Sequence, residues 1–112
     1  MLAGPADGEN KMIDLLKFLK ELNYQAWCIK GGPKEVEDYK LEIIIKNFEK
    51  SYSNFEILDH MRFLNRYEWR FIDGPKGEWW LRRVDKTKLE GPRDYFFSGK
   101  LIEIFEWLME IR

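Results

Sequence analysis

The stretch from Tyr67 to Val84, YEWRFIDGPKGEWWLRRV, constrains the fold of this chain more than any other part of the sequence. Its centre, from Asp73 to Gly77, has the composition of a turn, because glycine readily adopts positive φ and proline does not fit a central strand. On both sides stand aromatic and branched residues, which are typical of β-strands. The stretch therefore predicts a β-hairpin.

The alternation of side chains predicts a register for this hairpin. Pairing Ile72 with Glu78 across the turn gathers the aromatic and aliphatic side chains on one face, which we expect to join the core: Tyr67, Trp69, Phe71, Trp79 and Leu81. In this register Phe71 stands opposite Trp79. A slip of one residue would turn every side chain to the other face, so the apolar pattern favours the register chosen here.

The second face of the hairpin, opposite the apolar face, contains the candidate functional residues. The predicted register places Arg70 opposite Trp80 as a cation–π pair, and Glu68 opposite Arg82 as a pair of opposite charges. If helices cover the apolar face, then Arg70, Trp80 and Arg82 lie on an open face of the sheet.

Length and composition limit the class of protein. At 112 residues the chain is long enough for one domain, and its 45% apolar and 16% aromatic content exclude intrinsic disorder. No apolar run is long enough to cross a membrane, and the first residues do not resemble a signal peptide. The single cysteine, Cys28, suits a reducing compartment. We expect a cytoplasmic protein with a flexible leader over residues 1–10 and a single domain over residues 11–112.

Helical periodicity appears in three other segments. Apolar residues at helical spacing predict helices over Lys11–Leu22, over Asn54–Arg66 and from about Ser98 to near the end of the chain. The second of these begins with a capping box, in which Ser53 precedes Glu56 by three residues.

Two further segments are interpreted as strands. They are Tyr24–Lys30 (YQAWCIK) and Tyr39–Phe48, in which every second residue is apolar: Tyr39, Leu41, Ile43 and Ile45. The resulting order is α-β-β-α-β-β-α. It predicts an α+β fold with a four-stranded, mostly antiparallel sheet and helices packed on one face.

No motif in the sequence specifies a reaction. His60 is the only histidine, so no cluster of zinc-type ligands forms around it, and we expect a surface or partly packed residue. Cys28 is interpreted as a small buried hydrophobe rather than a nucleophile. No glycine-rich phosphate loop is present. We expect a non-catalytic protein without a cofactor or a bound metal.

The favoured functional hypothesis is protein–protein interaction through the open sheet face. Tryptophan and arginine dominate the energetics of protein interfaces, so Arg70, Trp80 and Arg82 are the residues of interest. The partner would be another protein or a second copy of the chain. We expect a small binding or regulatory module.

The alternative hypothesis is binding to nucleic acid. Residues 62–93 contain nine basic side chains against five acidic ones. Arginine interleaved with tryptophan can hold phosphates and stack bases, as in proteins that bind single strands. The same face would then work together with Lys86 and Lys88 of the connector that follows the hairpin. The opposing interpretation is a solvated sheet face whose charges neutralise one another.

The composition also bears on the source of the protein. The chain has one glutamine and one threonine beside abundant lysine, glutamate and isoleucine. This bias resembles that of hyperthermophile proteins, and an AT-rich genome produces part of the same bias. The melting temperature of the purified protein would separate the two explanations.

Overall fold

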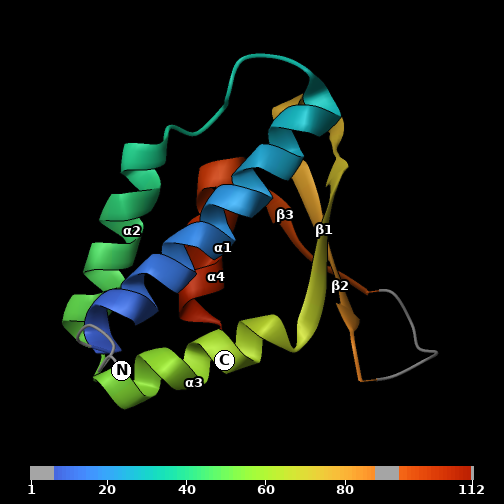
Figure 1. Cartoon of the computed structure of the whole chain (residues 1–112). Coiled ribbons are helices and arrows are strands. Elements are labelled where there is room, and N and C mark those ends of the chain that lie inside the picture. Colours follow the sequence, from blue (N-terminus) through green and yellow to red (C-terminus); the bar gives the residue numbers. More distant parts are fainter. Residues whose placement is uncertain (1–6, 88–93, 112) are drawn as a thin grey trace.

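The computed structural model describes residues 7–87 and 94–111 of the chain. These residues form four α-helices, three strands and one 3-10 turn (Figure 1). In chain order they are α1 (Asp7–Lys30), α2 (Asp38–Ser51), α3 (Asn54–Asn65), β1 (Tyr67–Asp73), η1 (Pro75–Gly77), β2 (Trp79–Asp85), β3 (Asp94–Gly99) and α4 (Leu101–Glu110). The α+β class is confirmed, but the order α-α-α-β-β-β-α replaces the predicted one.

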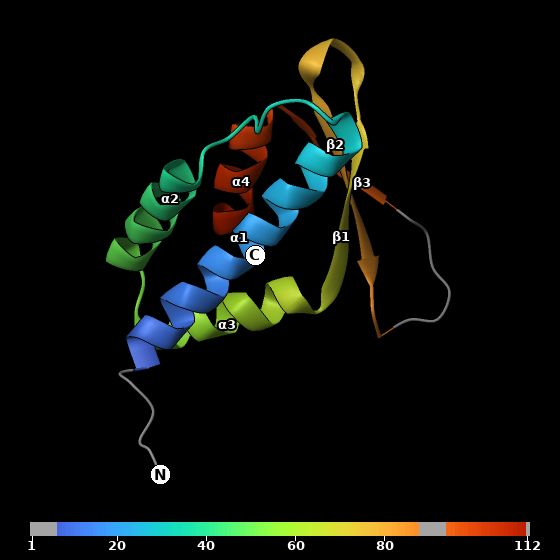
Figure 2. The ribbon, with the colours of Figure 1, turned by 45° about the horizontal axis from the view of Figure 1, so that its top comes forward.

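The sheet is antiparallel with the order β1-β2-β3, so β2 is its central strand. The prediction of four strands is wrong, because the sheet of the described residues has three. In Figures 1 and 2 the helices lie to one side of the sheet, and its other side faces away from them. The open face that the sequence predicted is therefore present.

The first correction concerns Tyr24–Lys30, which is the last part of α1 and not a strand. Buried residues recur at helical spacing from Leu15 onward, and the last of them falls within the segment predicted as a strand: Leu15, Leu19, Leu22 and Ala26. The helix ends at Gly31, whose φ of 65° only glycine adopts readily and whose N–H donates to the Trp27 carbonyl at 2.8 Å.

Asparagine often ends a helix, but Asn23 lies in the interior of α1 and is buried. Its Nδ2 donates to the Val36 carbonyl at 2.7 Å. The side chain thus holds the loop between α1 and α2 against α1.

The second correction concerns Tyr39–Phe48, which belongs to α2 and is not a strand. Leu41, Ile45 and Phe48 are buried at spacings of four and three residues, as one face of a helix requires. Ile43, which an alternating strand would bury with them, is 51% exposed. The apolar residues of this segment fit both the two-residue period of a strand and the 3.6-residue period of a helix. Packing against α1 and α4 favours the helix.

The predictions for α3 and α4 rested on local signals and are confirmed. The Ser53 hydroxyl accepts the Glu56 N–H at 3.2 Å, and the Glu56 carboxylate accepts the Ser53 N–H at 3.1 Å, so the capping box is present. Helix α4 begins at Leu101, three residues after Ser98, because Ser98 still belongs to β3.

The hairpin between β1 and β2 is confirmed, but its register differs from the prediction by two residues. Phe71 stands opposite Leu81 rather than Trp79, because Asp73 remains in the strand and pairs with Trp79. The turn then closes with a hydrogen bond from the Gly74 N–H to the Glu78 carbonyl at 2.9 Å.

A shift of the register by two residues leaves each side chain of the hairpin on its predicted face. The apolar face packs into the core as predicted, with four residues buried and Tyr67 half-buried: Trp69, Phe71, Trp79 and Leu81.

Two buried side chains complete the ends of helices. His60 is 2% exposed, which corrects the prediction of a surface or partly packed residue. Its Nε2 lies 2.7 Å from the Leu108 carbonyl near the end of α4, and since a carbonyl only accepts, this nitrogen carries the proton. Trp69 donates its Nε1–H to the Leu64 carbonyl near the end of α3 at 2.9 Å. Both carbonyls lie in the last turn of a helix, where backbone acceptors lack helical partners.

Helix α1 also covers the outer edge of β1. The side-chain amide oxygen Oε1 of Gln25 accepts the Phe71 N–H at 2.8 Å, on the side of β1 that faces away from β2. An uncovered edge strand offers its backbone groups to other chains, so this contact protects β1 from unwanted pairing.

Cys28 is exposed on α1, so the prediction of a buried cysteine is wrong.

The turn end of the hairpin is tied to the end of α1 through Lys30. Its Nζ lies 3.5 Å from Asp73 Oδ1, 3.6 Å from Glu35 Oε1 and 4.3 Å from the centre of the Trp79 ring. The Trp79 Nε1–H points to Glu35 Oε2 at 3.2 Å. These contacts fix the hairpin against the helices and so orient the opposite face of the sheet.

Across the residues that the structure describes, no helix combines the length and the apolar character needed to span a membrane.

Candidate protein-binding face of the sheet

The face of the sheet that points away from the helices is organised in rows across the strands. The first row contains Ile72, Trp80 and Ser98, with Trp80 in the central strand. The second row contains Arg70 and Arg82, which are directly opposite each other. We call this surface the open face, and define it by the described side chains Glu68, Arg70, Ile72, Trp80, Arg82, Val84 and Ser98.

Trp80 is the large apolar side chain at the centre of the open face. It is 39% exposed, whereas Trp79 beside it in sequence is 1% exposed and lies in the core. The indole lies over Gly74 of the turn, where a Cβ atom would come within 3.3 Å of Trp80 Cδ1 and 2.9 Å of the Glu78 carbonyl oxygen. The lack of a side chain at Gly74 therefore lets the turn pack closely against the indole of Trp80.

The charged residues of the open face are arranged differently from the prediction. Arg70 is opposite Arg82, and Trp80 is opposite Ile72, so Arg70 and Trp80 are related diagonally rather than directly. Glu68 is opposite Val84 instead of Arg82. It forms an ion pair with Arg70 on its own strand, in which Arg70 Nε donates to Glu68 Oε1 at 2.6 Å. Arg70 remains 65% exposed in this pair.

The other basic residues of the hairpin region do not join the open face as one surface. Arg83 points to the covered side, where its guanidinium lies 4.0 Å from the centre of the Tyr67 ring. Arg66 pairs with Asp85 at 3.2 Å. Lys86 is exposed just beyond β2, and its backbone N–H donates to the Arg66 carbonyl at 3.1 Å. Lys88, the last of the predicted binding residues, lies outside the described residues.

Asp85 closes the turn that follows β2. The Thr87 hydroxyl donates to its Oδ1 at 2.7 Å and the Thr87 N–H donates to the same oxygen at 2.9 Å. These two hydrogen bonds, with a smaller contribution from Arg66, lower the pKa of Asp85 to about 2. The carboxylate thus anchors the start of the connector that carries Lys86.

The low pKa of Asp85 predicts a specific loss of stability in acid. Because the folded pKa lies below the unfolded value, the stabilising contribution is complete above the unfolded pKa of about 3.9 and is lost as the pH falls through about 2. We expect the difference in unfolding free energy between wild type and Asp85→Asn to be constant above about pH 5 and to shrink between about pH 4 and pH 2. Urea unfolding at a series of pH values measures it.

The hydroxyl donor provides the control for this prediction. Thr87→Val removes the largest cause of the shift and should raise the pKa of Asp85 towards its ordinary range. A carboxyl carbon resonance of Asp85 that titrates near pH 4 in the wild-type protein would contradict the assignment.

The helices carry exposed aromatic side chains that the sequence pattern did not reveal. Tyr24 and Trp27 on α1 form an edge-to-face pair with ring centres 5.8 Å apart, and Phe55 on α3 is largely exposed. Tyr24 and Trp27 fell in the segment interpreted as a strand, where no face could be assigned to them. Helical numbering would have placed Tyr24 opposite Leu15, Leu22 and Ala26.

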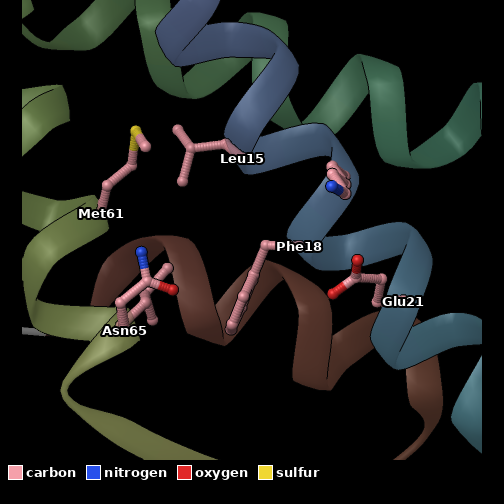
Figure 3. A pocket seen from close by; sticks show the side chains of 7 residues that line it. Leu15, Phe18, Glu21, Met61 and Asn65 are labelled. Carbon is pink, nitrogen blue, oxygen red and sulfur yellow. The ribbon is translucent and has the colours of Figure 1, made fainter.

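A groove of about 250 Å³ lies between α1 and α3 (Figure 3). Leu15, Phe18 and Glu21 come from α1, and Met61 and Asn65 from α3. Its lining mixes apolar side chains with the polar Lys17, Glu21 and Asn65. Within residues 7–87 and 94–111, no three His, Cys, Asp or Glu side chains gather in an arrangement that could hold a metal ion.

Comparison with known proteins adds no assignment: no protein-family model, curated protein or solved structure matches this chain. A functional proposal therefore depends on the geometry of the described residues.

Proposed function

We propose that this protein is a small binding or regulatory module that recognises another protein, or a second copy of itself, through the open face. The observation that carries the proposal is the exposed Trp80 in the central strand, with Ile72 and the two arginines beside it. Aromatic and arginine side chains on a rigid surface are the usual anchors of protein interfaces. Holding Trp80 over the turn reduces the entropy lost on binding.

The dimensions of the sheet limit the strength of this interaction. Seven-residue strands are roughly 23 Å long, and three strands are roughly 14 Å wide, so the open face offers on the order of 300 Å². Stable interfaces use about 800 Å² of each partner. A partner confined to this face would bind transiently, and a stable complex would also use the hairpin turn or the region around Lys86.

The distribution of charge favours a protein over nucleic acid. Affinity for nucleic acid comes mainly from several cations that contact successive phosphates. Here Arg66 pairs with Asp85, and Arg83 lies on the covered side. Within the described part of the hairpin region, these side chains therefore do not extend Arg70 and Arg82 into a continuous basic track.

The test of the proposal is the loss of binding in Trp80→Ala. We expect this variant to weaken self-association or partner binding about 30-fold, equivalent to about 2 kcal/mol, as for a tryptophan hot spot. Sedimentation equilibrium measures self-association, and quantitative mass spectrometry of proteins retained on immobilised wild type and variant measures partner binding. Phe55→Ala removes an exposed aromatic from α3 and should leave both unchanged.

Two results would reject the proposal. The first is unchanged self-association and unchanged partner retention in Trp80→Ala. The second is retained material that is sensitive to nuclease and whose binding falls steeply and log-linearly with salt, since that dependence identifies a nucleic-acid ligand.

A further inference from the structure

The paired arginines of the open face are an unusual feature of this sheet. Arg70 of β1 and Arg82 of β2 are direct cross-strand partners, and residues at such positions have Cβ atoms about 4.5–5.5 Å apart. Like charges placed directly opposite each other destabilise a sheet. An anion shared between the two guanidinium groups would turn this repulsion into attraction.

Glu68 supplies an anion to Arg70 of this pair. Glu68 lies two residues before Arg70 on the same strand, and both partners of this ion pair are well exposed. Exposed pairs of this kind contribute little, typically below about 1 kcal/mol. An incoming carboxylate can therefore displace Glu68 or add to it at small cost.

The apolar row lies directly beside the basic row. Trp80 and Ile72 are each two residues from the arginine on their own strand, which corresponds to about 7 Å along a strand. An extended peptide has the same spacing between residues i and i+2, whose side chains point to the same side. A segment with an acidic residue and an apolar residue at these positions therefore matches both rows at once.

We infer that the partner of the open face is an acidic protein segment in extended conformation, which places a carboxylate between Arg70 and Arg82 and an apolar side chain on Trp80 and Ile72. A guanidinium group can bind a carboxylate through two parallel hydrogen bonds, which fixes the orientation of the carboxylate and also attracts it. The inference rests on the proposed function and specifies the chemistry of its partner. A nucleic-acid base can stack on Trp80, but the cross-strand neighbour Ile72 is aliphatic, so the row as a whole favours an apolar side chain over a base.

The inference can be tested with three labelled probes and fluorescence polarisation. The probes are a twelve-residue peptide that repeats Leu-Leu-Glu-Glu, so that leucine and glutamate alternate at positions i and i+2 on each side, its counterpart with glutamine in place of glutamate, and a twelve-nucleotide oligothymidylate. We expect the glutamate peptide to bind at least tenfold more tightly than the glutamine peptide. Arg70→Gln and Arg82→Gln should each weaken binding of the glutamate peptide about tenfold and leave the glutamine peptide unaffected.

The controls separate this inference from the proposed function. Trp80→Ala should weaken both peptides, and Lys46→Gln, on the exposed side of α2, should weaken neither. Equal binding of the two peptides with an effect of Trp80→Ala alone would overturn the acidic partner and leave a protein-binding face. If neither peptide binds, or if no variant of the open face changes peptide binding, both the inference and the proposed function are contradicted. Tighter binding of the oligothymidylate, reduced in the arginine variants, would replace the acidic segment with nucleic acid.

Discussion

Replacing Ile45 with alanine should lower the free energy of unfolding by about 2–5 kcal/mol. Ile45 is fully buried in α2, and truncation leaves a cavity between this helix and its neighbours. The same change at Ile43 should cost less than about 0.5 kcal/mol, because Ile43 is 51% exposed and alanine is the better helix former. Chemical denaturation of the two variants measures both values.

This pair of variants distinguishes the helix from the strand that the sequence pattern suggested. In a strand, Ile43 and Ile45 point to the same side and would be buried together. Similar losses of stability for Ile43→Ala and Ile45→Ala would therefore contradict α2. Leu41→Ala, which removes another fully buried side chain of α2, should resemble Ile45→Ala and not Ile43→Ala.

The segments that the sequence predicted correctly are those with strong local signals. The capping box of Ser53 and Glu56 fixes the start of α3 by two reciprocal hydrogen bonds, whatever packs around it. Between β1 and β2, Gly74 and Gly77 permit the turn, and alternation then assigns Trp79 to the core and Trp80 to the open face. An error of two residues in register does not change that assignment.

The segments that were predicted incorrectly either lack a strong local signal or have a pattern that fits both a strand and a helix. In Tyr39–Phe48 the apolar residues satisfy both the strand period and the helical period, and only packing against α1 and α4 decides between them. Strand β3 was not predicted, although three successive aromatic residues at 95–97 favour a strand. Its pairing with β2 is a long-range contact, which a local pattern does not contain.

The open face shows the same division. Alternation alone placed Arg70, Trp80 and Arg82 on one surface, and the structure has them there. The direct opposition of Arg70 and Arg82 was not predicted, because it depends on whether the turn begins at Asp73 or at Gly74. The binding role of these residues stays a prediction.

His60→Phe should lower the free energy of unfolding by about 1–3 kcal/mol, although the ring volume is nearly preserved. The buried Nε2 of His60 donates to the Leu108 carbonyl at 2.7 Å, and phenylalanine leaves this carbonyl without that donor. The neighbouring rings of Phe48 and Phe63, with centres 5.0 Å and 6.0 Å from His60, can accommodate a benzyl group. His60→Ala adds a cavity to the lost hydrogen bond, so its cost should rise to about 3–5 kcal/mol.

Amide hydrogen exchange locates this effect in the structure. His60 joins α3 to the last turn of α4, so His60→Phe should reduce protection first in the amides of that turn, before the hairpin is affected. Arg62→Ala provides a matched control on the exposed side of α3 and should change stability by less than about 0.5 kcal/mol. If His60→Phe is equally mild, the contact with Leu108 does not contribute to stability. A cost in the expected range means that the buried hydrogen bond from His60 helps to hold the end of α4 against α3.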